Sequence, residues 1–169
     1  MAEIFPDFDE ARRMVVRLLE PEKDWRQFAA FRLQQMRLNE FSPAVIAEMS
    51  VWTESRWMVD LCKSNRTYFV VTDEQRILGF GCLSKQRFKD QDCREIALEV
   101  SAEVEGRGLG TSLYSHMKEH ARTHHPGEIV LAKILSDNAK SIRAATKAGF
   151  THIDNGVFDG VAYGVYSPT

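Results

Sequence analysis

The sequence predicts an α/β domain of the α+β kind, with a mixed and mostly antiparallel central sheet flanked by helices. Three runs rich in β-forming residues, at 67–72, 77–83 and 94–101, are joined by short polar turns, so these strands should be antiparallel. Helical patterns precede them and alternate with strands after them. We see no internal repeat or linker, and therefore expect one domain over residues 1–169, with 1–13 as a polar lead-in or short extra helix.

The elements before these runs follow from apolar spacing and capping residues. Met14–Leu19 is apolar apart from one arginine and is typical of a first strand. Asp24 is then expected to cap the N-terminus of a helix, and Ser42-Pro43 is a favourable start for the next one. That second helical stretch should extend to about Ser64, with a break near Thr53.

The last third of the chain is expected to alternate helices and strands. A helix opened by glycines ends near His125, and Glu128–Leu135 is an apolar strand. The helix after it should end at Gly149, a favoured residue just past a helix C-terminus. Two final strands follow, with turn signals at Asn155-Gly156 and Asp159-Gly160.

A glycine-rich loop joins the third of the antiparallel strands to a helix, and it reads Gly106-Arg107-Gly108-Leu109-Gly110. Such a turn directs several backbone N–H groups at one point, and the helix N-terminus adds about half a positive charge there. Glycine permits positive φ and a close approach of the backbone. The loop therefore predicts an anion site, and a phosphate or pyrophosphate fits it best.

Two other phosphate-binding patterns fit less well. A Walker loop requires Gly-Lys-Ser or Gly-Lys-Thr four residues after a first glycine, and no such run exists. A dinucleotide fingerprint requires a third glycine where Thr111 stands, and it belongs near the start of a fold rather than past its middle. A glycine-rich turn without any ligand is the remaining alternative.

The flanks of the loop resemble the GNAT family of N-acetyltransferases. Val100 is followed by four residues and then Glu105-Gly106-Arg107-Gly108, which is similar to the family's acyl-CoA loop. Asn138 stands eleven residues before Gly149-Phe150, which is the spacing of the family's second motif. The run Ala132–Ile142 resembles the phosphinothricin and related amine acetyltransferase branch.

The resemblance implies acetyl-CoA as co-substrate and a sheet that splays after the strand ending at Val100, with the pantetheine arm in the splay. The implied cofactor-binding residues are Leu98, Val100, Glu105, Gly106, Arg107, Gly108, Leu109, Gly110, Thr111, Asn138, Ser141 and Lys147. Two positions depart from the family pattern. Glu105 replaces the usual Gln or Arg beside the pyrophosphate, and Ala145 replaces a Tyr that often protonates the leaving thiolate.

Direct attack of an amine on the thioester requires a base and an acid. Glu99 and Glu95 share one face of their strand, and Glu99, adjacent to the pantetheine position, is the first choice of base; a surface carboxylate is the alternative. Tyr163, Tyr166 or water would supply the acid. The acceptor site is expected between the Arg37–Pro43 loop and the last hairpin, with Asn39, Glu40 and Tyr163 as candidates.

The composition bounds the partners. A net charge of −2 argues against nucleic acid, and no apolar run approaches the ~20 residues of a membrane span. An acidic N-terminus and three widely spaced cysteines favour the cytoplasm. His116, His120 and His124 line one helix face, but without a closing ligand we expect no metal.

The sequence thus predicts an N-acetyltransferase of small-molecule or peptide amines, and an exposed last strand would allow a homodimer. The alternatives are an acyl-CoA-binding sensor with little catalysis, suggested by Ala145 and Glu105, and a nucleotide-binding protein, suggested by the glycine loop alone.

Overall fold

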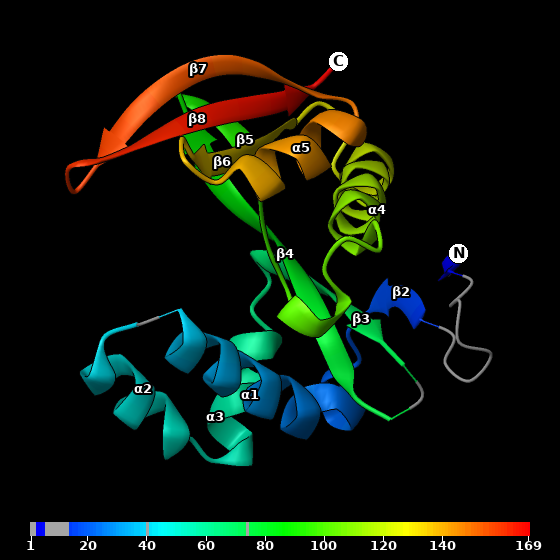
Figure 1. The fold of residues 1–169 in the computed structure, drawn as a ribbon, viewed down its shortest axis with the longest axis vertical. Coiled ribbons are helices and arrows are strands. Elements are labelled where there is room, and N and C mark those ends of the chain that lie inside the picture. Colours follow the sequence, from blue (N-terminus) through cyan, green and yellow to red (C-terminus); the bar gives the residue numbers. More distant parts are fainter. Residues whose placement is uncertain (1–2, 6–13, 40, 74) are drawn as a thin grey trace.

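A computed structural model describes residues 3–5, 14–39, 41–73 and 75–169. Figure 1 shows the course of the chain through these residues. The elements, in order, are β1 (Glu3–Phe5), β2 (Met14–Leu18), α1 (Pro21–Leu38), α2 (Pro43–Ser50), α3 (Glu54–Leu61), β3 (Arg66–Thr72), β4 (Ile77–Phe88), β5 (Gln91–Val100), the short 3-10 helix Ala102–Val104, α4 (Leu109–His124), β6 (Ile129–Leu135), α5 (Ala139–Lys147), β7 (Phe150–Phe158) and β8 (Val161–Pro168).

The described strands form one sheet in the order β1-β2-β3-β4-β5-β6-β8-β7. Neighbouring strands are antiparallel except β5 and β6, which are parallel. The predicted mixed, mostly antiparallel sheet is therefore confirmed. The consecutive strands β3, β4 and β5 are antiparallel neighbours, as short connections require.

The sheet opens between its two parallel strands. β5 pairs with β6 only over Cys93–Ile96, opposite Ile129–Ala132. Beyond this point β5 stays with β4 as far as Val100, whereas β6 stays with β8 as far as Leu135. Figure 1 shows the lower part of β4 running down toward the first three helices, away from β6 and β8. This divergence is the splay that the resemblance implied.

Helices cover both faces of the sheet and enclose separate cores. On one face α1 and α3 pack against β3 and β4 through an aromatic cluster that includes Phe28, Trp57, Tyr68 and Phe80. On the other face α4 packs against β2 to β5 and α5 against β6 and β7, and Leu113 and Met117 of α4 have no exposed surface. Burial of these side chains, at roughly 1.5–3 kcal/mol each, fixes the strand ends that carry the site.

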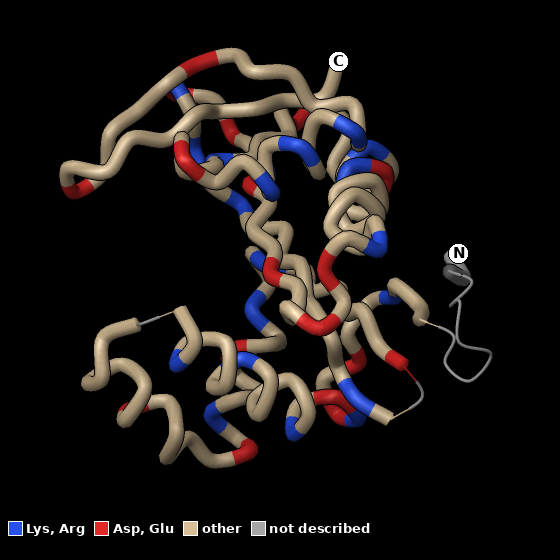
Figure 2. The backbone as a smooth tube through the Cα atoms, viewed as in Figure 1, with Lys and Arg blue, Asp and Glu red and all other residues tan. Residues whose placement is uncertain are grey.

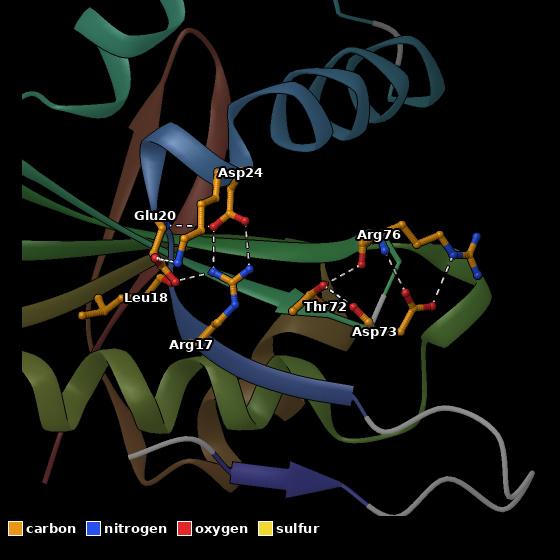
Figure 3. A network of polar contacts seen from close by, with 8 residues as sticks. Arg17, Leu18, Glu20, Asp24, Thr72, Asp73 and Arg76 are labelled. Atoms are coloured by element: carbon orange, nitrogen blue, oxygen red, sulfur yellow. Dashed lines mark hydrogen bonds and ion pairs between the residues drawn. The ribbon is translucent and has the colours of Figure 1, made fainter.

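Helix α1 begins earlier than predicted, and Asp24 is not its N-cap. The helix starts at Pro21 with Glu20 as N-cap. Asp24 lies one turn inside the helix, where its carboxylate accepts the Glu20 N–H at 2.8 Å and pairs with both terminal nitrogens of Arg17 on β2. Figure 3 shows this network tying the end of β2 to the first turn of α1.

The other boundaries differ in smaller ways. The lead-in contains a strand, β1, paired with β2. The break near Thr53 is confirmed, because its hydroxyl caps α3, but α3 ends at Leu61 rather than near Ser64. Among the described helices, none is long and apolar enough to cross a membrane.

One of the two predicted turns in the last hairpin is wrong. The chain reverses at Asp159-Gly160, where both residues have positive φ (52° and 79°). Asn155 and Gly156 lie inside β7 instead. A Cβ at Gly156 would come within 2.3 Å of the far end of the Tyr163 ring on the neighbouring strand, so a larger residue there would have to displace that ring.

Candidate acetyl-CoA and acceptor site

The glycine loop has the geometry of an anion site. Gly106 and Gly108 have φ of 80° and 82°, and a Cβ on either would meet nothing within 4 Å, so positive φ rather than crowding calls for glycine. Gly108 is the N-cap of α4, and the first helical bond runs from Ser112 N–H to Gly108 O. The amides of Leu109, Gly110 and Thr111 therefore precede the helical ladder and are directed out of the helix end.

Helix α5 supplies cations beside this loop. Gly110 approaches α5 so closely that its Cβ would lie 3.5 Å from that of Ala144. Lys140 and Lys147 lie four residues before and three after Ala144, hence on the same face of α5. Lys140 forms an ion pair with Glu105. The departure at Glu105 is thus balanced by a neighbouring lysine, and its carboxylate turns toward α5.

The splay leaves part of the β5 backbone without a strand partner in the described chain. Ser101 N–H donates to Leu78 O at 2.8 Å, so Glu99 and Ala97 also direct their backbone groups toward β4. Leu98 and Val100, which alternate with Ala97 and Glu99 along the strand, direct their backbone N–H and C=O groups toward the side of β6. They lie beyond Ile96, the last β5 residue that pairs with β6. Their side chains pack on the core under α4.

Residues of the second motif, which begins at Asn138, cap and anchor helix α5. The Asn138 side chain accepts the Ser141 N–H at 3.0 Å and so caps α5. The Ser141 hydroxyl contacts the hydroxyl of Tyr114, on α4, at 3.0 Å, and burial raises the pKa of Tyr114. Ala145 has no exposed surface and belongs to the core, so the place of the family's usual tyrosine lies against packed side chains.

Glu99 lies on the opposite face of the sheet from α4, opposite Phe80 of β4. Arg32 of α1 donates to its Oε2 at 2.9 Å, and the amide nitrogen of Asn39 donates to its Oε1. The Glu99 side chain is 16% exposed. Burial raises the pKa of Glu99, and the positive charge of Arg32 opposes this shift. A half-buried carboxylate with a raised pKa suits a general base.

Glu95 and Tyr163 stand further along the same face. Glu95 Oε2 is 2.7 Å from the Lys133 ammonium of β6. Tyr163 packs with Cys93, Leu131 and Val165, whose side chains lie on this face, and its ring covers Gly156. Glu95 is therefore held in an ion pair four residues from Glu99, and Tyr163 belongs to the part of the sheet beyond the splay.

A groove lies at the end of α1. It is lined by Arg37, Phe41, Pro43, Ile46, Ala47 and Ser50. Asn39, predicted as an acceptor-site residue, contacts Glu99, whereas Glu40 lies outside the described residues. Asn39 thus stands beside the candidate base, and Phe41 of the groove contacts Arg32, the other partner of Glu99.

The three helix-face histidines form no metal group. His120 stacks on His124 with ring centroids 4.0 Å apart and meets the Phe69 ring edge-on. Burial lowers the pKa of His120. Within the ranges that the structure describes, no group of three or more His, Cys, Asp or Glu side chains is placed to hold a metal.

Several partners of the site residues are absent from the sequence prediction. They are Arg32, Lys133, Lys140 and Tyr114. Each lies 27 or more residues from the group it contacts, so no local pattern indicates the contact. The one available signal is that Arg32 and Asn39 occur near the end of the helix that leads into the predicted acceptor loop.

An anion-binding loop beside an open strand edge, with a carboxylate on the other face of the sheet, is the arrangement expected of an acyl-CoA-dependent transferase. Residues 25–150 match the model of the Acetyltransferase (GNAT) family, and the chain belongs to that family. No curated protein matches the sequence. The family is thus established, whereas the phosphinothricin-like branch has no support in these comparisons.

Solved structures show the same fold at low identity. Ribosomal-protein-S5-alanine acetyltransferase from Vibrio fischeri is 19% identical with a TM-score of 0.71, covering 98% of this chain and 95% of its own. The protein yncA from Salmonella typhimurium, solved with its cofactor acetyl-CoA, is 21% identical with a TM-score of 0.65, covering 91% and 92%. A variant of spermidine N-acetyltransferase from Vibrio cholerae is 17% identical with a TM-score of 0.66, covering 90% and 92%.

Proposed function

We propose that the protein transfers an acetyl group from acetyl-CoA to a primary amine of a small molecule or a peptide. The observation that carries this proposal is the position of Glu99. It stands on the strand whose open edge and following loop fit acetyl-CoA. Its partner Arg32 contacts Phe41, which lines the groove at the end of α1. Family membership supports the reaction class, and the small-amine and protein substrates named for two fold relatives are consistent with an amine acceptor.

The residues present fit acetyl-CoA. The backbone of Leu98 and Val100 offers an extended edge to the two amides of pantetheine, as a strand would. The amides of the glycine loop, with Lys140 and Lys147 nearby, fit the pyrophosphate. Arg107 lies exposed in the same loop, and Asn138 and Ser141 begin the helix that flanks the splay.

In the proposed mechanism the bound acceptor arrives as an ammonium and gives a proton to Glu99, directly or through one water. The free amine attacks the thioester carbonyl carbon, the C–N bond forms, and the C–S bond then breaks. The thiolate that leaves takes a proton from Tyr163 or from water, and the acetylated nitrogen loses its remaining extra proton to solvent. Holding amine and thioester together supplies a large share of the rate, and the base adds a further factor of roughly 10²–10⁴.

A second candidate function is an acyl-CoA-binding sensor with little catalysis. It is favoured by the burial of Ala145, which puts no acidic group at the place where the family often has a tyrosine. Both functions require acetyl-CoA binding, so turnover is what separates them.

The test is release of free thiol from acetyl-CoA with a panel of primary amines, for the wild type, Glu99→Gln and Glu95→Gln. We expect amine-dependent release that falls at least about a hundredfold in Glu99→Gln, with acetyl-CoA still raising Tm. Loss in Glu95→Gln alone would move the role of base to Glu95. Absence of release with every amine, together with a raised Tm, would favour the sensor.

We also propose a homodimer formed through the last hairpin. The expectation of an exposed last strand was wrong, because β8 pairs with β6 on one side and with β7 on the other. β7 is instead an edge strand of the sheet, and Ile153, Val157 and Phe158 on it are exposed apolar side chains. Light scattering should give twice the 19.3 kDa chain mass, and a monomeric mass would exclude this assembly.

A further inference from the structure

Arg32 is held between two aromatic rings and a carboxylate. Its guanidinium carbon lies 5.3 Å from the Phe80 ring centroid and 5.5 Å from that of Phe41. Its Nη1 lies 2.9 Å from Glu99 Oε2, and the Arg32 side chain is 26% exposed. Three separate parts of the chain therefore meet at one guanidinium, namely α1, the sheet, and the segment that leads into α2.

The chemistry of this contact calls for arginine. A planar guanidinium stacks on aromatic rings and donates in its own plane, whereas a lysine ammonium is a compact point charge that does not stack. Asn39 holds the second oxygen of Glu99, so each carboxylate oxygen has a donor from the α1 end. This leaves the Glu99 carboxylate with one defined orientation.

We propose that Arg32 is a positioning residue, which keeps the Glu99 carboxylate ionised and oriented and couples it to the acceptor groove through Phe41. Phe41 forms part of the groove wall, and its ring contacts Arg32. An acceptor that presses on Phe41 therefore also fixes Arg32 and, through it, the base. This proposal rests on the proposed function, since it takes Glu99 as the base.

The surrounding charges determine the sign of the effect. Arg32 and Asn39 face Glu99 from α1 and its end, and both lower the Glu99 pKa, whereas burial raises it. Cys82 on β4, two residues from Phe80, has its own pKa raised by burial to about 11 and is neutral near pH 7. Glu95, on the same strand, is paired with Lys133. Removal of Arg32 takes away the positive charge that lowers the Glu99 pKa, so we expect that pKa to rise.

The experiment compares Arg32→Gln and Arg32→Lys with Arg26→Gln as matched control. Arg26 lies six residues earlier on the same helix, is exposed, and stacks on Trp25 with its guanidinium carbon 5.1 Å from the ring centroid. The readouts are the pH profile of kcat/KM for one amine acceptor, and KM for acetyl-CoA. In Arg32→Gln we expect the acid limb to move up by about 1 pH unit, so that kcat/KM on the acid side of the limb falls about tenfold.

The remaining outcomes divide the explanations. In Arg32→Lys the limb should stay near the wild-type position while kcat/KM for the amine falls a few fold, because charge is kept and stacking is lost. KM for acetyl-CoA should not change in either variant, and Arg26→Gln should match the wild type. An acid limb of kcat/KM in Arg32→Gln that stays at the wild-type pH overturns the proposal. If Arg32→Gln does not fold, wild-type kcat/KM for the amine in Arg32→Lys overturns it instead.

Failure of the proposed function has a different signature. If Glu99→Gln keeps amine-dependent thiol release, Glu99 is not the base and the role of Arg32 falls with it. If Glu99→Gln loses release while Arg32→Gln keeps the wild-type acid limb, the base assignment stands and only the role of Arg32 is lost.

Discussion

Removal of the carboxylate of Glu105 should strengthen acetyl-CoA binding. Glu105 stands at the entrance of the glycine loop, paired with Lys140, and their side chains are 41% and 72% exposed. Two unit charges at about 4 Å interact by roughly 1 kcal/mol in water, and the lysine offsets part of the repulsion that Glu105 exerts on a pyrophosphate. We therefore expect Glu105→Gln to gain about 0.5–1 kcal/mol, which lowers KM for acetyl-CoA about two- to fivefold.

The assay is KM for acetyl-CoA at low and at high salt, together with Tm. Because an exposed ion pair stabilises the fold by at most about 1 kcal/mol, Tm should change little. The gain should shrink at high salt, where the charges are screened. Glu103→Gln is the matched control, since Glu103 is 46% exposed in the same loop and paired with Arg76. An unchanged or raised KM in Glu105→Gln would refute the placement of pyrophosphate at this loop.

Three further predictions concern the scaffold. Asp24→Asn should lower the free energy of unfolding at pH 7 by about 2 kcal/mol. Burial raises the pKa of Asp24, but hydrogen bonds from Arg17 and a backbone amide bring it below its usual value. The stability that the carboxylate contributes is therefore present above about pH 4 and is lost as pH falls through the folded-state pKa. Denaturation should show a smaller stability difference between Asp24→Asn and the wild type at pH 3 than at pH 7. Gly156→Ala should cost about 1–3 kcal/mol by denaturation, because its Cβ would overlap the tyrosine ring opposite at 2.3 Å, and full stability would contradict that packing. Gly108→Ala and Gly127→Ala, with φ of 82° and 87° and open space around both, should each cost about 1 kcal/mol, yet only the first should raise KM for acetyl-CoA.

Features that depend on local spacing could be predicted from the sequence. The glycine loop, the helix break near Thr53 and the end of α5 at Gly149 follow from short-range chemistry, and the structure has each of them. The common face of Glu95 and Glu99 follows from the period of two in a strand. Where a side chain could either cap a helix or pair with a distant residue, the tertiary structure determines which role it takes. Asp24 carries a capping side chain, but it serves Arg17 across the β2–α1 connection.

Long-range partners could not be predicted in this way. Arg32 and Glu99 are 67 residues apart, and Glu95 and Lys133 are 38 apart. Nothing in either local pattern specifies which arginine meets which carboxylate, because that depends on how α1 crosses β4 and β5. The turn signal at Asn155-Gly156 was misleading for the same reason, since in the structure Gly156 lies under the Tyr163 ring of the neighbouring strand.

Charges of both signs are distributed over all parts of the described backbone, as Figure 2 shows. The sites considered above therefore depend on individual charges, such as Lys140 at the loop and Arg32 at Glu99, rather than on a broad field. Substitution of one of these residues should act locally, which makes single-residue controls informative.

The gap between β5 and β6 also has a consequence for the integrity of the sheet. The strands β1–β5 are joined to β6–β8 through four residue pairs between β5 and β6, from Cys93 to Ile96 of β5. Past Ile96 the side of β5 that faces β6 is an unpaired edge inside the sheet. Such an edge can accept any extended chain, so the empty protein carries within its own fold a template for unwanted strand addition. If acetyl-CoA binds as proposed, its pantetheine arm would act as a removable ninth strand beside the eight described ones. We therefore expect acetyl-CoA to protect this edge from strand addition as well as to raise Tm.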